Sequence, residues 1–548
     1  MRQRLRRQHC PLTRNGPLSG FILANMRFNL CGVSAHMPTR SRDPLRAEPR
    51  VSALPRSHYA IIFLTMASAE SAPDPALGEP SHELRRELGL RDLVLAQVLC
   101  VVGSGWVGVA AKLGQAHAVF WIGSMVLFYL PLAIVVIYLN REMPLEGGLY
   151  EWSRQGFGEM LGFLTGWNLW VYALVVIPSI LFMIPTELAY LIGPAGTWLP
   201  GNKVATSLLV GLVIVGIATV AARGLGASKQ LHNAGSAMIV TAYAILLMLP
   251  LWPLLHGHAI AYTPLPVRMP SVSWFSLAVF GQITVGGLSG FEYVAIMAGE
   301  CRNPVRSIAR SVAISAPLIA MMFILGTSSV LAFVGTRPID LIGPIPQTFR
   351  LAFGTAAWGA VLAPCAIFLL LGRAVAAGSL IFTGLTRLPM AAGWDHLLPQ
   401  WFTALHPRWR TPVNSILFVA GLSLLFVVLS MVGVHEQEAM QLLSNASSVH
   451  YGIAYVALFA IPLLGAAGLR RRLPLWVKCA AAAGLLSSLV AVMIGTYPII
   501  NVSSRVSYAA KIGGTVIISN LAGVILYLTR KRTPLQPRSL ASPIRRRI

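Results

Sequence analysis

Long apolar runs recur along this chain and restrict what it can fold into. Twelve stretches are nearly free of charged residues, and short polar loops separate them. A helical run of about 20 apolar residues matches the hydrocarbon thickness of a bilayer. Helices are expected because lipid offers backbone groups no partner and the runs are too long for barrel strands. The runs are about 93–112, 117–139, 161–191, 203–222, 232–255, 275–299, 311–334, 357–386, 413–434, 439–464, 475–498 and 507–529.

The low content of charged residues and the lack of catalytic or metal-binding motifs narrow the predicted class of protein further. Only 11% of the 548 residues are charged, whereas a soluble domain carries about 25%. The six cysteines form no CxxC or Cys/His cluster, so neither a disulfide framework nor a metal site is indicated, and no cofactor is expected. Nucleophile-elbow and zinc-protease motifs are missing from the sequence, so no catalytic residue is predicted and an enzyme is not expected. We therefore predict an all-α polytopic membrane protein.

The formal charge of the chain is +24, and its Lys and Arg residues are distributed as a membrane topology with the N-terminus inside predicts. If the N-terminus lies inside, the inner loops carry fourteen Lys and Arg residues and the outer loops carry seven. An excess of Lys and Arg marks the cytoplasmic side of a membrane protein. We therefore expect a multi-pass protein of the plasma or inner cell membrane with both termini in the cytoplasm, and no nucleic-acid partner.

Residues 1–85 are predicted to be a disordered, basic N-terminal extension. Eleven arginines against two acidic residues give residues 1–58 a charge of +9. No apolar h-region of a secretory signal precedes the first run. Two interpretations of residues 1–65 stay open: a basic cytoplasmic tail, or translated upstream sequence with the native start at Met66. We favour Met66, because MASAESAPDPALGEPSHELRREL is typical of an ordinary start.

Two of the twelve runs contain glycine clusters near their middle. The first run holds Gly103, Ser104, Gly105 and Gly108, and the sixth holds Gly286, Gly287, Ser289 and Gly290. Matching interruptions in two halves of a membrane protein indicate a transporter built from inverted repeats. Unwound backbone exposes N–H and C=O groups as ligands, and a half-helix N-terminus favours an anion. The alternative is close helix packing through small residues.

Four motifs occur in the order and at the spans typical of one transporter group. They are GSG at 103–105, MPLEGGLYEWSRQGFGEMLGFLTGW at 143–167, GFE with AGECRNPVRS within 290–307, and TRLPMAAGWDHLLPQWFTALHPRWRTPVNS at 386–415. From about residue 90 to 530 the chain resembles the amino acid–polyamine–organocation (APC) superfamily and its amino acid permeases. The resemblance covers most of the chain.

The resemblance implies a LeuT-type fold, a 5+5 inverted repeat plus two extra transmembrane helices, twelve in total. Spans 1–5 would occupy residues 86–256, spans 6–10 residues 257–465 and spans 11–12 residues 466–530, before a cytoplasmic tail at 531–548. The backbone of Gly103, Ser104 and Gly105 would hold an amino acid's α-carboxylate. The carbonyls near Gly286, Gly287, Ser289 and Gly290 would hold its α-ammonium.

Two departures from the family pattern bear on the site. Many members carry an aromatic residue in span 6 about six residues before the glutamate of GFE, and Gly286 stands in that place here. Trp106, directly after the first interruption, is the candidate to cover the substrate instead. Some members carry a lysine in span 5 at the position of a sodium site, whereas GSAMIVTAYAILLM at 235–248 has none, which leaves the coupling ion open.

Ionisable residues inside predicted spans mark functional candidates. Glu292 follows the second interruption and would gate, sense protons or help to bind a cation; the alternative is a neutral acid bonded to a neighbouring helix. Arg373, near the middle of span 8, needs an anion or a wet cavity. Its candidate partners are Glu292, Glu187 and a substrate carboxylate. His450 in span 10 would relay protons or, as we favour, form neutral hydrogen bonds.

We therefore expect a secondary active transporter that moves an amino acid across the cell membrane by alternating access, with proton symport and exchange both open. Its partners would be a small-molecule substrate, the lipid bilayer and, as a candidate, protons. One alternative is a polyamine or organocation transporter of the same superfamily. The alternative from another class is a nutrient sensor that binds without transporting.

Overall fold

The computed structural model describes residues 89–143, 148–255, 260–290, 304–354, 359–391, 394, 398, 400–466 and 473–529. These residues all belong to one unit, Thr65–Ile548. Every regular element within these ranges is helical, and none is a strand. The all-α prediction is therefore confirmed for this part of the chain.

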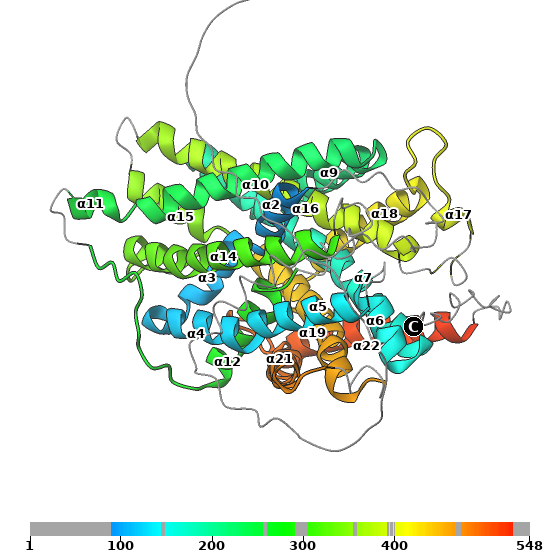
Figure 1. Cartoon of the computed structure of the whole chain (residues 1–548). Coiled ribbons are helices and arrows are strands. Elements are labelled where there is room, and N and C mark those ends of the chain that lie inside the picture. The colour runs from blue at the N-terminus through cyan, green and yellow to red at the C-terminus, as the bar shows by residue number, and fades with distance from the viewer. Residues whose placement is uncertain are drawn as a thin grey trace, which may run out of the picture. The chain divides into compact units, whose positions relative to one another are not determined.

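The first half of the described chain contains the first interruption, between α2 and α3 (Figure 1). Its elements are α2 (Leu90–Val101), α3 (Ser104–Ala111), η1 (Gly114–Ala116), α4 (His117–Ser124), η2 (Met125–Tyr129), α5 (Leu130–Glu142), α6 (Leu149–Phe157), α7 (Glu159–Leu181), α8 (Met183–Ile192), η3 (Pro194–Gly196), α9 (Lys203–Ala222), α10 (Leu225–Met248) and α11 (Leu251–Leu255).

The second half repeats the pattern of long apolar helices and opens on the second interruption. Its elements are α12 (Trp274–Gly281), η4 (Gln282–Gly287), α14 (Pro304–Val334), α15 (Pro344–Phe353), α16 (Gly359–Ala391), α17 (Gln400–Thr403), α18 (Val413–Ser430), α19 (Glu436–Leu464), α21 (Leu475–Ile494) and α22 (Arg505–Thr529).

The observed helices coincide with the predicted apolar runs. Among the described residues, ten helical segments are long and apolar enough to cross a membrane, or eleven if the bent pair α2 and α3 counts as one span. The sixth run is described only as the shorter apolar helix Trp274–Gly287. The count of twelve therefore stays a prediction, and so do the boundaries of the two repeats.

Local sequence explains where several helices begin. The side chain of Asn202 accepts hydrogen bonds from the N–H groups of Val204 and Ala205 at 3.1 and 3.0 Å and so caps α9. Ser273 caps α12 in the same way, accepting from the N–H of Ser276 at 3.1 Å. Side-chain oxygens thus satisfy backbone donors that the helix itself leaves without partners.

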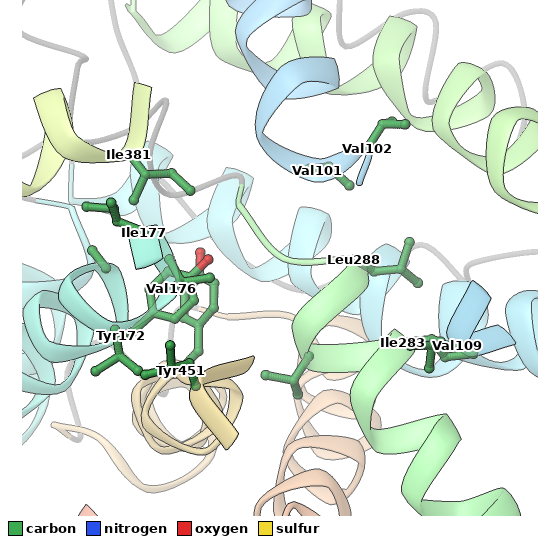
Figure 2. Close-up of a cluster of buried hydrophobic side chains, with 14 of the residues drawn as sticks. Val101, Val102, Val109, Tyr172, Val176, Ile177, Ile283, Leu288, Ile381 and Tyr451 are labelled. Carbon is green, nitrogen blue, oxygen red and sulfur yellow. The ribbon is translucent and has the colours of Figure 1, made fainter. Parts of the chain in front are cut away.

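The helices that carry both interruptions lie among long, well-packed neighbours. α10 packs along α16, and α7 packs along α19 (Figure 1). α2 contacts α14, α10 and α16, whereas η4 contacts α19 and α21. Figure 2 shows part of the apolar core they share, with Tyr172 of α7 beside Tyr451 of α19. The two rings stack with centroids 3.7 Å apart.

A buried polar network ties α7, α19 and α22 together at His450. One ring nitrogen, Nδ1, lies 2.8 Å from Oδ1 of Asn168. The other, Nε2, lies 3.1 Å from the hydroxyl of Ser519. Asn520 completes the network by donating to Asn168 at 3.2 Å. Because both nitrogens already have neutral partners, the arrangement matches the hydrogen-bonded interpretation of His450.

Candidate functional site at two helix breaks

The first break separates α2 from α3 by a bend of 45°. Gly103 lies in the gap with an extended backbone, φ −109° and ψ 136°. The break leaves the last carbonyls of α2 and the first N–H groups of α3 without partners in their own helix. The hydroxyl of Tyr243, on α10, donates to the carbonyl of Gly103 at 3.3 Å.

The second break follows η4, a π-helical turn of the kind frequent at functional sites. Gly290 has φ +128°, which favours glycine over residues with a side chain. Its N–H donates to the hydroxyl of Tyr455 at 3.3 Å. A Cβ at Gly290 would lie 3.0 Å from Sγ of Cys100, at the end of α2. The second break therefore lies directly against the first.

Apolar side chains line the space where the two breaks meet. Figure 2 shows Val101 and Val102 at the end of α2 and Leu288 at the end of η4. Their exposed fractions are 1%, 0% and 0%. Water is thereby kept from the backbone groups that both breaks expose, which strengthens any electrostatic contact made there.

Trp106 of α3 connects the two breaks. A Cβ at Gly103 would lie 2.8 Å from Cδ1 of this indole. A Cβ at Gly286 would lie 2.9 Å from Cζ3 of the same ring and 3.0 Å from Oγ of Ser448. Gly287 lies beside the indole as well. The indole thus fills the space that a side chain at Gly286 would need, which explains why a glycine stands at this position.

Arg373 of α16 brings a positive charge to the first break. Its side chain is almost completely buried, with 3% exposed. A Cβ at Gly103 would lie 3.4 Å from its Nη2. Among the described residues, Nε and Nη1 have no hydrogen-bond partner. Two donors of a buried guanidinium thus remain available beside exposed backbone.

Glu187 of α8 brings the opposite charge to the same place. It is fully buried, and its Oε1 accepts from the hydroxyl of Ser104 at 3.5 Å. Its Oε2 has no partner in the described part of the chain, nor has the hydroxyl of Ser289. Glu187 and Arg373 interact electrostatically, but within the described ranges no ion pair within 4.0 Å is found between them. A gap therefore separates two opposite charges beside the breaks.

The structure brings most of the predicted site residues together. Gly103, Ser104, Trp106, Gly286, Gly287, Ser289 and Gly290 surround the two breaks, and Arg373 adjoins them. Gly105 lies inside α3, where its Cβ position is 3.6 Å from the carbonyl oxygen of Leu341. Glu292 lies outside the described residues. Of the three partners suggested for Arg373, Glu187 shares its surroundings; the other two stay predictions.

Sequence analysis missed two tyrosines of this site. The hydroxyls of Tyr243 and Tyr455 each bond to one of the breaks. A tyrosine placed in the middle of an apolar span is a usable signal, because its hydroxyl needs a hydrogen-bond partner when buried. The sequence gives no indication of which partner, because that depends on how α10 and α19 face the breaks.

Comparisons with known proteins agree with this arrangement. A family model described as "Amino acid permease" matches residues 88–526. The uncharacterized transporter lpg1691 of Legionella pneumophila is 26% identical over 387 residues, which are 69% of this chain and 80% of the relative. The methylthioribose transporter of Bacillus subtilis is 26% identical over 353 residues, 61% of this chain and 73% of the relative.

A solved structure shares the fold at low sequence identity. The crystal structure of MhsT in complex with L-phenylalanine matches with a TM-score of 0.55 and 12% identity. The match covers 75% of this chain and 99% of that one. The likeness shows the fold, which is the LeuT type expected from the sequence.

Proposed function

The chain belongs to the amino acid permease family of the APC superfamily, a family of transporters, and from that premise we propose that it is a secondary active transporter of an amino acid. It works by alternating access in the plasma or inner cell membrane, with both termini in the cytoplasm. Its substrate is a small molecule that carries both a carboxylate and an ammonium group. Proton symport and exchange are the two modes of coupling to be distinguished.

The observation that carries this proposal is the set of unused polar groups at the two breaks. Arg373 offers two donors, and Glu187 and Ser289 offer acceptors, all in a place closed to water. Buried polar atoms without partners are rare and costly unless a ligand completes them. A zwitterion supplies one group of each sign and fits this set.

The orientation of the zwitterion follows from the broken helices. The first N–H groups of α3, at Ser104, Gly105 and Trp106, favour an anion, as does the guanidinium of Arg373. The α-carboxylate of the substrate binds there. Carbonyls from Gly286 to Gly290 and the carboxylate of Glu187 receive the α-ammonium. Trp106 covers the side that Gly286 leaves open.

Relatives support the substrate class without fixing it. One relative, AapA of Bacillus subtilis, is named an amino-acid permease, and another is named a methylthioribose transporter. An uncharged thio-sugar has no need of a guanidinium at its site, whereas an amino acid has. The buried charges at Arg373 and Glu187 therefore favour an amino acid.

Uptake by the purified chain in liposomes tests the proposal. Labelled L-amino acids, methylthioribose and putrescine are offered, with and without an inward proton gradient, and with unlabelled substrate inside for exchange. We expect accumulation or exchange of at least one amino acid. No transport of any compound in the panel contradicts the proposal. Ligand-dependent thermal stabilisation without transport identifies a sensor instead.

A matched pair of glycine variants links transport to the breaks. Gly290 and Gly335 both have positive φ, at +128° and +59°. A methyl at Gly290 meets Cys100, whereas a methyl at Gly335 meets nothing within 4 Å. We expect Gly290→Ala to lose most transport and Gly335→Ala to retain it. Equal transport by the two variants contradicts a role for the second break.

A further inference from the structure

A cavity of about 700 Å³ lies between α8, α15 and the start of α19. The half-helix α3 lies beside the cavity wall, because a Cβ at Gly108 would lie 2.9 Å from Cγ of Pro344 and 3.5 Å from the carbonyl oxygen of Asp340, which lines the cavity. The polar and charged side chains that line it include Thr186, Tyr190, Lys203, Asp340, Arg350 and Glu436. Under the proposed topology it opens to the outside.

Glu436 lines this cavity, and no described Lys or Arg forms an ion pair with its carboxylate. It is the first residue of α19 and is 8% exposed. Within the described ranges it accepts one hydrogen bond, from the hydroxyl of Thr186 at 3.4 Å, and takes part in no ion pair. The helix N-terminus favours a negative charge at this position.

Asp340 places a second carboxylate on the same wall. Its Oδ1 accepts from the N–H groups of Ile342 and Gly343 at 2.9 and 3.1 Å, and its Oδ2 accepts from the hydroxyl of Tyr190 at 2.9 Å. These bonds hold the carboxylate in position. Asp340 and Glu436 interact electrostatically as like charges. A positive group bound between them relieves that repulsion.

The two cationic side chains that line the cavity, Lys203 and Arg350, donate hydrogen bonds to backbone carbonyls. Lys203 donates to the carbonyl of Met431 at 3.2 Å. Arg350 donates to the carbonyl of Leu191 at 2.9 Å and also bonds to that of Tyr190. The bonded donors of both side chains thus point to fixed carbonyl oxygens. Neither side chain forms an ion pair with Glu436 in the part of the chain that is described.

Two consecutive residues of α8 connect this cavity with the helix breaks. Thr186 bonds to Glu436 in the cavity. Glu187, the next residue, bonds to Ser104 at the first break. A ligand bound to Glu436 and Thr186 would therefore contact α8 at the residue next to Glu187. The buried carboxylate of Glu187 belongs to the site at the helix breaks.

We infer that this cavity is a second binding site, in which Glu436, Thr186 and Asp340 receive the ammonium group of an amine or amino acid before it reaches the helix breaks. An ammonium has three N–H donors and a positive charge, which match two carboxylates and a hydroxyl. The inference rests on the proposed function for the identity of the ligand. The cavity itself and its charges are independent of it.

Charge changes at Gln437 test the inference. Gln437 is exposed and lines the cavity. The purified full-length protein is titrated calorimetrically with putrescine, with L-leucine and with 1,4-butanediol, which has the carbon chain of putrescine but no ammonium. We expect Gln437→Glu to tighten and Gln437→Lys to weaken ammonium binding, each by about 3-fold to 10-fold. Butanediol should not bind.

Glu436→Gln with Glu438→Gln as its control gives a second measurement. Both residues lie in the first turn of α19, but Glu438 does not line the cavity. Only Glu436→Gln should lower ammonium affinity and raise KM in liposomes. Putrescine binding without leucine binding identifies an amine as the ligand, and the reverse an amino acid.

Three outcomes overturn the inference. They are equal ammonium affinity in Gln437→Glu and Gln437→Lys, binding of butanediol as tight as that of putrescine, and ammonium affinity unchanged in Glu436→Gln. If wild-type protein transports the panel while these results are obtained, the second site fails and the transport function stands. If ammonium binds as expected but nothing is transported, the second site stands and the transport function fails.

Discussion

Tyr243 donates a hydrogen bond of 3.3 Å to the carbonyl of Gly103, the residue at which the first span changes direction. A carbonyl exposed by a helix break in an apolar environment is costly unless it is satisfied. The bond also joins α10, which packs along α16, to the centre of the proposed site. One hydroxyl therefore holds the break in its observed geometry.

Tyr243→Phe should reduce transport without preventing folding. Loss of one buried hydrogen bond costs about 1 kcal/mol, which corresponds to a roughly 5-fold effect on the state that it stabilises. We expect the turnover to fall by about that factor in liposome uptake. Tyr508→Phe is the control, because Tyr508 accepts a bond from Asn445 at 3.1 Å away from both breaks. Equal effects of the two variants would make the bond to Gly103 merely structural.

Gly286→Ala should displace Trp106. The added methyl would lie 2.9 Å from Cζ3 of the indole and 3.0 Å from Oγ of Ser448. Overpacking of this kind costs about 1–3 kcal/mol, so we expect a lower melting temperature and a raised KM. Gly514→Ala, on α22, meets nothing within 4 Å and should be neutral or slightly stabilising. Unchanged KM in Gly286→Ala would show that the indole does not cover the substrate.

Arg373 and Glu187 should show coupled effects on stability. Removing one of two buried opposite charges leaves the other uncompensated, at a cost of about 3–5 kcal/mol. We expect Arg373→Met and Glu187→Gln each to lower the melting temperature, and the double variant to recover part of the loss. All three variants should transport poorly, because both groups are proposed to hold substrate.

The partly exposed pair Asp92 and Lys229 supplies a comparison for that coupling. Nζ of Lys229 lies 2.8 Å from Oδ2 of Asp92, and 27% of the Lys229 side chain and 17% of the Asp92 side chain are exposed. Neutralising this pair should give a coupling of about 0–1 kcal/mol. Additive losses at Arg373 and Glu187 would mean that their charges do not compensate each other.

Cysteine labelling should reveal the orientation of the chain. In a cysteine-free background, Gly201→Cys lies in an exposed loop before α9, and Arg408→Cys lies in an exposed loop before α18. The positive-inside rule places the first loop outside and the second inside. We expect a membrane-impermeant maleimide to label position 201 in intact cells and position 408 only after lysis. The opposite pattern would reverse the proposed topology.

The sequence predicted the breaks well because glycine in a membrane helix has few physical explanations. GSG at 103–105 and GGLSG at 286–290 both lie where the structure leaves regular α-helix. Unwound backbone explains some glycines of the two clusters, and close packing of helices explains others. Gly103 and Gly290 adopt backbone that is not helical. Gly105 and Gly108 lie within α3 and allow close packing against the loop at Leu341 and against Pro344.

The surroundings of Arg373 could be only partly predicted. Burial of an arginine in span 8 indicated an anionic neighbour, and Glu187 was among the candidates. Which helix faces which depends on rotations that an apolar pattern does not specify, because α7, α10 and α16 are apolar on most sides. For the same reason the cavity at Glu436 was missed, since its walls come from three loops and helix ends distant in sequence.

The 45° bend between α2 and α3 has a mechanical consequence. A straight span transmits a tilt at one membrane surface to the other, as a rigid rod does. A jointed span need not, because its two halves have different neighbours as well as a shared one. α3 packs against α15 and the loop at Leu341, α2 packs against α10, and α14 contacts both. Under the proposed topology α3 is the outer half of this span. A molecule that binds α3 and immobilises it would therefore block motion at the outer side of the membrane while α2 stays free to move.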